Sequence, residues 1–186
     1  QKIIAGDPRF REAFFRTLTL RAAGVNDFQK LPIPFRAVAT DIETGDAVVL
    51  DHGSLAQAMR ASMSVPGGMA PVEIDGRLLV DGGIANNLPI DLVRKVCADV
   101  VIAVNISTPP LKRDEITSAL TATAQLMNFL GLANVDAQLK SLGSRDVLVT
   151  PDLGNISAAS FERAADAIRI GEAAARKMAD SLKRYA

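Results

Sequence analysis

The sequence contains few of the side chains that most often carry covalent or metal-dependent chemistry. Its 186 residues include one cysteine, one histidine and no tryptophan. A single cysteine excludes an internal disulfide and a cysteine-based zinc cluster. We expect this thiol, Cys97, to be buried and structural, because its neighbours are apolar and free cysteine is usually buried. Chemistry in this chain therefore has to rely on other groups.

An excess of charge of either sign is also absent. The 21 Lys and Arg residues balance 21 Asp and Glu residues, so the formal net charge is zero. This balance predicts no nucleic acid partner and no strong attraction to an anionic membrane. No apolar run is long enough to span a bilayer. The chain begins at Gln1 without an initiator Met or signal-peptide anatomy, and we interpret it as a piece of a longer protein.

Hydrophobic residues make up 48% of the chain, which is enough to build the core of one domain of ordinary size. Predicted strands alternate with predicted helices, a pattern typical of α/β proteins. We expect strands near residues 35–41, 47–50, 71–74, 78–80, 100–104 and 147–150. We expect helices near residues 8–20, 55–62, 89–96, 114–130 and 134–142, and from residue 160 to the end.

Two Asp-Gly pairs lie six residues apart in different local settings. Asp75-Gly76 has strand-like residues on both sides and is explained by a two-residue hairpin turn. Asp81-Gly82-Gly83 follows an apolar strand, but a predicted helix comes after it instead of a returning strand. The ends of central strands are where open α/β sheets gather ligands and catalytic groups. From spacing alone we favour a structural role, in which the Asp81 carboxylate caps a backbone amide in a strand-to-helix turn. The alternative is that Asp81 is a catalytic carboxylate.

Four stretches of the sequence favour the catalytic alternative. Residues 31–41, 58–66, 75–89 and 161–178 resemble bacterial patatin-like phospholipases. The resemblance covers essentially the whole chain and implies that residues 1–186 are the C-terminal portion of a single patatin-like domain. The implied fold is a three-layer α/β fold with a central, mostly parallel sheet flanked by helices.

The implied activity is that of a lipid acyl hydrolase with a Ser–Asp dyad, in which Asp81 is the catalytic aspartate and Gly82 and Gly83 support the motif. The resemblance implies no cofactor and no metal. It implies a phospholipid or other lipid ester as substrate, the N-terminal part of the same domain as partner, and transient contact with a membrane surface. Localisation and oligomeric state stay open.

The family also uses a Gly-x-Ser-x-Gly nucleophile elbow and a glycine-rich oxyanion loop, and both are missing from this sequence. Ser141 comes nearest, with Gly143 after it but Leu139 before it. In the family's order these elements precede Gln1, so we expect the isolated chain to be inactive. A second departure is Gly67-Gly68-Met69, where relatives often have bulkier apolar residues, which puts the shape of the acyl pocket in doubt.

The sequence also leaves four alternatives for single residues or for the whole chain. His52 lies in a polar Asp-His-Gly turn and is more simply an exposed loop residue than the base of a triad. Asn86 and Asn87 are candidate caps for the helix near Pro89, or a lining of the site. The chain as a whole is alternatively a non-catalytic lipid-binding or interaction domain that retains the fold. A nucleotide-binding domain has little support, because no glycine-rich phosphate loop is present.

Overall fold

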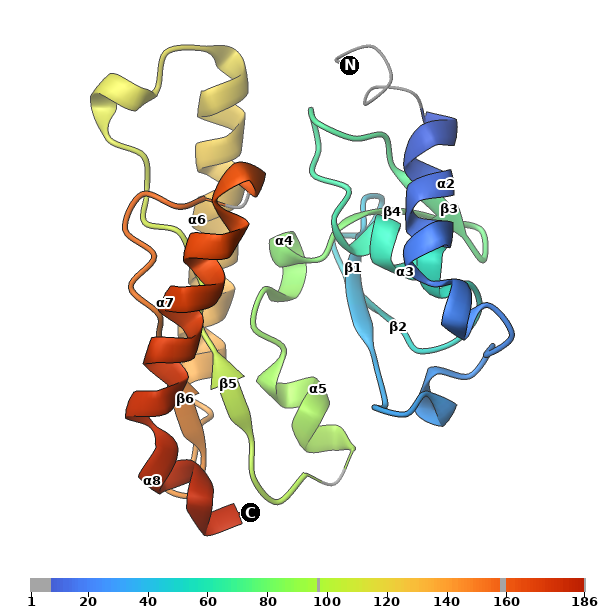
Figure 1. Ribbon diagram of the computed structural model, residues 1–186. Helices are drawn as coiled ribbons and strands as arrows, with labels where there is room; N and C mark the ends of the chain where they lie inside the picture. Colours follow the sequence, from blue (N-terminus) through green and yellow to red (C-terminus); the bar gives the residue numbers. More distant parts are fainter. Residues whose placement is uncertain (1–7, 97, 158–159, 186) are drawn as a thin grey trace. The chain divides into compact units, whose positions relative to one another are not determined.

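The computed structural model describes residues 8–96, 98–157 and 160–185, so Cys97 and its expected burial lie outside the described residues. The chain divides into two compact units, which are considered separately below. Unit 1 extends to Asn87 and unit 2 begins at Leu88. Strands and helices alternate along the chain (Figure 1), which confirms the predicted α/β class.

Unit 1 contains a four-stranded sheet with the strand order β2-β1-β4-β3. The three strand pairs within it are all antiparallel. Our expectation of a mostly parallel sheet is therefore wrong for this unit. For two of the pairs the physical reason is local, since tight turns connect β1 to β2 and β3 to β4 and make each pair run antiparallel. The strands are β1 (Ala37–Asp41), β2 (Ala47–Leu50), β3 (Val72–Ile74) and β4 (Arg77–Asp81).

The predicted hairpin at Asp75-Gly76 is confirmed. Both residues have positive φ, 51° and 73°, as a two-residue turn between twisted strands requires. The register pairs Ile74 with Arg77 directly across this turn. The earlier turn is also confirmed, because the Asp41 carboxylate accepts a hydrogen bond from the Glu43 amide at 3.0 Å. Both Asp residues are therefore explained by turn chemistry.

The helices of unit 1 cover the sheet through small apolar residues. Helix α3 (Leu55–Ser62) is capped by Ser54, whose side chain accepts a hydrogen bond from the Gln57 amide. Phe28 and Leu79, both 0% exposed, pack in one core with six further buried residues, and burial of a Phe or Leu side chain contributes about 2 kcal/mol. These are Ala37, Ala39, Leu50, Ala58, Ala61 and Val72.

The remaining helical segments of unit 1 are α2 (Pro8–Leu18), α4 (Gly83–Asn86) and two 3-10 turns, Leu20–Ala22 and Phe28–Lys30. Figure 1 shows α2 beside α3, and the two helices are in contact. On α2, Phe15 is buried whereas Phe14 and Leu18 are more than half exposed. Phe15 therefore supplies a buried side chain of this helix.

Unit 2 contains one parallel strand pair, β5 (Ile102–Val104) with β6 (Val147–Val149). Its first helix, α5 (Ile90–Lys95), begins where Pro89 predicted, and Pro89 itself is the N-cap residue. Asn86 and Asn87 lie before that position, so the prediction that they cap this helix is wrong. Gln138 links α5 to the next long helix, because its side chain bonds both the amide and the carboxylate of Asp91.

The two helices predicted near residues 114–130 and 134–142 form one helix, α6 (Ala119–Leu139). It begins later than predicted because Ser118 and Thr121 form a capping box, in which each side chain accepts a hydrogen bond from the other's backbone amide. Gly131 does not interrupt it, since a glycine inside a helix costs only about 1 kcal/mol. The prediction of two helices is therefore corrected to one. A 3-10 turn, Arg113–Glu115, precedes it.

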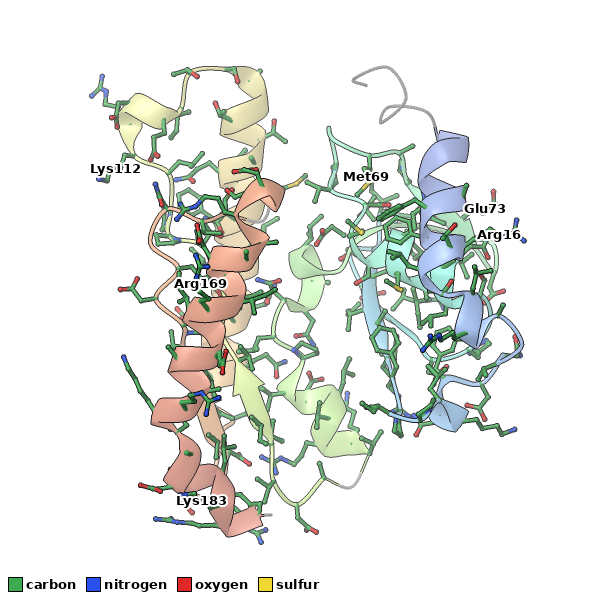
Figure 2. The ribbon with its side chains drawn as sticks, viewed as in Figure 1. Arg16, Met69, Glu73, Lys112, Arg169 and Lys183 are labelled. Atoms are coloured by element: carbon green, nitrogen blue, oxygen red, sulfur yellow. The ribbon has the colours of Figure 1, made fainter. Side chains whose placement is uncertain are left out.

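The C-terminal segment is helical as predicted, with a break at Met178. It consists of α7 (Ala164–Lys177), α8 (Ala179–Leu182) and the 3-10 turns Phe161–Arg163 and Lys183–Tyr185. Ile168 on α7 is 69% exposed. Arg169 pairs with Asp166 and Lys183 with Asp180, each three residues earlier along this segment (Figure 2 labels the two basic residues). Among the described helices, none combines the length and apolarity that crossing a membrane would need.

Candidate active site

Asp81 is the last residue of β4, an interior strand of the sheet in unit 1. The apolar residues just before it, Leu79 and Val80, are almost fully buried. Its carboxylate oxygen Oδ1 accepts a hydrogen bond from the Gly83 amide at 2.8 Å. Burial raises the pKa of the Asp81 carboxyl above its usual value, and the Gly83 bond offsets this only in part. The predicted position at the end of a buried strand is confirmed.

The backbone around Asp81 is held by three further hydrogen bonds. The Asp81 amide donates to the carbonyl of Ser64 at 3.0 Å, and the Gly82 amide donates to the carbonyl of Ser62 at 3.2 Å. The hydroxyl of Thr40 donates to the Asp81 carbonyl at 2.8 Å. Sequence reasoning missed these contacts, because α3 and β1 lie 17 to 41 residues away from Asp81 along the chain.

Position 82 requires glycine because there is no room for a side chain, and not because of its backbone conformation. Its φ of −71° is open to any residue. A Cβ atom at this position, however, would lie 2.0 Å from the carbonyl oxygen of Val38 and 2.5 Å from its carbonyl carbon. The end of β4 therefore lies against the backbone of β1 more closely than any side chain allows. Gly82 is therefore the residue that permits this close approach of the two backbones.

Gly83 leaves room beside the carboxylate. A Cβ atom here would lie 3.0 Å from the Asp81 Oδ1 atom and 2.8 Å from the Oδ1 atom of Asn87. A side chain at Gly83 would therefore displace one of the two groups. Asn87 thus lies next to the carboxylate, in agreement with the alternative that it lines the site. Asp81, Gly82 and Gly83 come together at the junction between β4 and α4.

His52 lies in the loop between β2 and α3, as predicted. Its side chain is 65% exposed, and its Nδ1 atom lies 2.7 Å from a carboxylate oxygen of Asp51. This hydrogen bond raises the pKa of His52, since it favours the charged imidazolium. The loop is anchored by main-chain bonds to residues 26–28. The exposed loop histidine that the sequence indicated is confirmed.

Two serines bear on the question of a nucleophile, Ser64 in unit 1 and Ser141 in unit 2, and both hydroxyls are bound to backbone carbonyls. Ser64 is 0% exposed, and its hydroxyl donates to the Arg60 carbonyl at 2.7 Å at the end of α3. Ser141, the nearest sequence match to an elbow, donates in the same way to the Gln138 carbonyl after α6. A buried or turn-bound hydroxyl of this kind is not poised as a nucleophile.

The Gly67-Gly68-Met69 segment lies in the loop between α3 and β3, where Figure 2 labels Met69. Gly67 has φ of 84°, so a residue without Cβ suits this turn. The amides of Gly68 and Met69 both donate to the Val65 carbonyl and close it. The departure from the bulkier family pattern therefore has a local backbone reason.

No cluster of three or more His, Cys, Asp or Glu side chains with the geometry of a metal site occurs in the part of the chain that the structure describes. The site is instead one half-buried carboxylate at the end of an interior strand. Such a group, with a raised pKa and a rigid backbone, is suited to accept a proton. These features define an α/β protein with a candidate general base.

Comparison with known proteins extends this assignment. The family described as patatin-like phospholipase matches residues 4–94, which include Asp81-Gly82-Gly83. An uncharacterized NTE family protein of Mycobacterium tuberculosis is 34% identical over 172 residues, 80% of this chain and 29% of that protein. A second one from the same organism is 49% identical over 79 residues, 42% of this chain and 22% of that protein.

Patatin-like phospholipase domain-containing protein 7 of Mus musculus is 44% identical over 89 residues, which is 47% of this chain and 6% of the mouse protein. The chain thus spans less than a third of the length of each of these relatives. The family match and the relatives show that the chain belongs to the patatin-like phospholipase family.

We expect Gly82→Ala to lower the free energy of unfolding by about 3 kcal/mol or more, because its methyl group would overlap the Val38 carbonyl and force the backbones apart. Gly24→Ala is the matched control in the same unit, since a Cβ there meets nothing within 4 Å. Urea denaturation followed by circular dichroism measures both. Equal midpoints for the two variants would show that β4 does not depend on this close approach.

Proposed function

We propose that this chain supplies the general base of a lipid acyl hydrolase that acts on phospholipids or related lipid esters. Asp81 is the base of a Ser–Asp dyad, and Gly82 and Gly83 shape its surroundings. The serine and the glycine-rich oxyanion loop belong to the N-terminal part of the same domain, in the longer protein. The observation that carries this proposal is a half-buried carboxylate, with raised pKa, at the end of an interior strand.

Several observations support Asp81 as a base. An ordinary Asp has a pKa of about 3.9 and is a weak base for a serine hydroxyl. The burial that raises the pKa of Asp81 strengthens it as a proton acceptor while leaving it able to ionise. Its backbone is fixed by bonds from β1 and α3, so the carboxylate is held in one direction. Preorganisation of this kind is what proton transfer in an enzyme needs.

In the proposed reaction the serine hydroxyl attacks the ester carbonyl carbon while Asp81 accepts its proton. The tetrahedral intermediate then collapses, the ester C–O bond breaks, and the proton passes from Asp81 to the departing alcohol. Water enters, Asp81 takes a proton from it, and hydroxide attack on the acyl-serine releases the fatty acid. The proton returns from Asp81 to the serine. The oxyanion loop would stabilise both tetrahedral intermediates.

The alternative is a lipid-binding or interaction domain that retains the fold without catalysis. The absence of Gly-x-Ser-x-Gly from these 186 residues is the observation that favours it. The sequence of the full-length protein distinguishes the two. A nucleophile elbow upstream of Gln1 supports the hydrolase, whereas its absence supports the binding domain.

The central test compares Asp81→Asn with Asp75→Asn in the full-length protein. Asn keeps the size and the hydrogen-bonding reach of Asp81 but removes the basic oxygen, so turnover of a phospholipid should fall at least about a hundredfold. Asp75 occupies a hairpin turn, where Asn is an equally good residue. Asp75→Asn should therefore leave turnover unchanged. Equal hydrolysis by both variants would make Asp81 a turn residue only.

Melting temperature is the second measurement in this comparison. The folded state raises the pKa of Asp81, so it binds the proton more tightly than the unfolded chain does. Stability from this group is therefore highest below the unfolded pKa of about 3.9 and declines as pH rises towards the folded pKa. At neutral pH Asn removes the cost of a half-buried charge. Asp81→Asn should accordingly melt no lower than wild type, which separates lost catalysis from lost folding.

His52→Gln should leave turnover in the full-length protein within a few-fold of wild type, because the histidine is exposed and bonded only locally to Asp51. A loss of about a hundredfold, equivalent to about 2.7 kcal/mol of barrier, with unchanged melting temperature, would indicate a triad. Steady-state hydrolysis of one phospholipid substrate by wild type and variant is sufficient to decide.

The 186-residue chain alone should not hydrolyse a short-chain p-nitrophenyl ester, because it contains no Gly-x-Ser-x-Gly and its serines near Asp81 are structural. The measurement is ester turnover by the purified chain, with its Asp81→Asn variant as the control for contaminating esterases. Turnover that disappears in the variant would reveal a nucleophile within these residues.

A further inference from the structure

We propose that Thr40 is a positioning residue for Asp81, holding the carboxylate in its direction through the main chain. This inference rests on the proposed function, because it concerns the same base. Thr40 lies on β1, the interior strand that pairs with β4, and is 2% exposed. Its hydroxyl donates to the carbonyl oxygen of Asp81 at 2.8 Å. Direct contact with the substrate is not part of its role.

The contact exists because of the strand register. Thr40 is paired with Val80 across the two strands, one residue before Asp81. The Asp81 residue is the last of β4, and the chain then turns into α4 at Gly82. A carbonyl at the end of a strand lies beyond the regular backbone hydrogen bonds of the sheet, and a side-chain donor from the neighbouring strand can satisfy it. The Thr40 hydroxyl is that donor.

The bonds around Asp81 fix both peptide planes that flank its Cα atom. The preceding plane is held because the Asp81 amide donates to the Ser64 carbonyl. The following plane is held at both ends, since its carbonyl accepts from Thr40 and its amide, that of Gly82, donates to the Ser62 carbonyl. With both planes fixed, the direction of the Cα–Cβ bond is set, and the bond from the Gly83 amide to Oδ1 then restrains the rotation of the carboxylate about it.

Of these three bonds only the one from Thr40 comes from a side chain. Any residue at 62 or 64 would offer the same backbone carbonyl, whereas removal of the Thr40 hydroxyl takes away one of the two bonds that hold the plane between Asp81 and Gly82. The Gly83 amide, which donates to the Asp81 carboxylate, follows directly after that plane. Loss of the Thr40 hydroxyl should therefore loosen the carboxylate as well as the main chain.

Two substitutions separate the hydroxyl from the packing of this buried residue. Thr40→Val keeps the shape and loses the hydroxyl, whereas Thr40→Ser keeps the hydroxyl and loses the methyl group. We expect Thr40→Val to lower kcat for phospholipid hydrolysis in the full-length protein by at least about tenfold, with KM within about twofold of wild type. Thr40→Ser should recover most of that loss, although both variants melt below wild type.

Thr44→Val is the matched control, because the Thr44 hydroxyl accepts a hydrogen bond from the Asp46 amide in the exposed turn after β1, away from Asp81. It should leave kcat unchanged. Hydrogen exchange of the Gly83 amide in the same full-length proteins gives a readout that does not need activity. Exchange should be at least about tenfold faster in Thr40→Val than in Thr40→Ser, because the amide loses a fixed carboxylate partner.

The outcomes separate this inference from the function on which it rests. Equal kcat for the Val and Ser variants, or equal Gly83 exchange, would overturn the positioning role of Thr40. Loss of activity in Asp81→Asn together with full activity in Thr40→Val would leave the dyad in place and reject only the positioning role. Full activity in Asp81→Asn would reject the proposed function itself. Where wild type shows no turnover, the exchange comparison alone decides.

Discussion

The close approach of Gly82 to the Val38 backbone is the constraint on which the site depends. Because Gly82 has no side chain, the end of β4 can lie directly against β1. At this distance the Thr40 hydroxyl reaches the Asp81 carbonyl. The same contact brings the chain past the end of α3, where the carbonyls of Ser62 and Ser64 accept the amides of Gly82 and Asp81. A single missing Cβ thus permits the whole set of bonds that orients one carboxylate.

The local structure of unit 1 could largely be predicted, because its signals are short-range. Positive φ at Asp75 and Gly76, the Ser54 cap and the position of Asp81 at a strand end all follow from neighbouring residues. The expectation of a mostly parallel sheet came from the resemblance and set aside the local signal, since tight turns make two of the three pairs antiparallel. The pairing of β1 with β4 joins strands far apart in the sequence, and the residues near either strand do not specify it.

The site divides in the same way. Asp81, Gly82 and Gly83 were recognisable because they are contiguous and match a family motif. Thr40 and the two serines were not, because hydrogen bonds to a main-chain carbonyl or amide leave no pattern in residue type. In unit 2 the error was of another kind: two helices were predicted near residues 114–130 and 134–142, but the capping box at Ser118 and helix-favouring residues throughout gave the single helix α6.

The proposed dyad requires an aspartate to perform a task that usually falls to histidine, so the environment of Asp81 has to raise the basicity that an ordinary aspartate lacks. Full burial would raise the pKa further but would also remove the carboxylate from its reaction partner. Here the carboxyl is only partly buried, and the single bond from the Gly83 amide opposes the effect of burial. The balance keeps the group ionisable and more basic than an exposed aspartate. His52 has the opposite arrangement, exposed and paired only with Asp51, and so lacks the packed neighbours that orient a catalytic base.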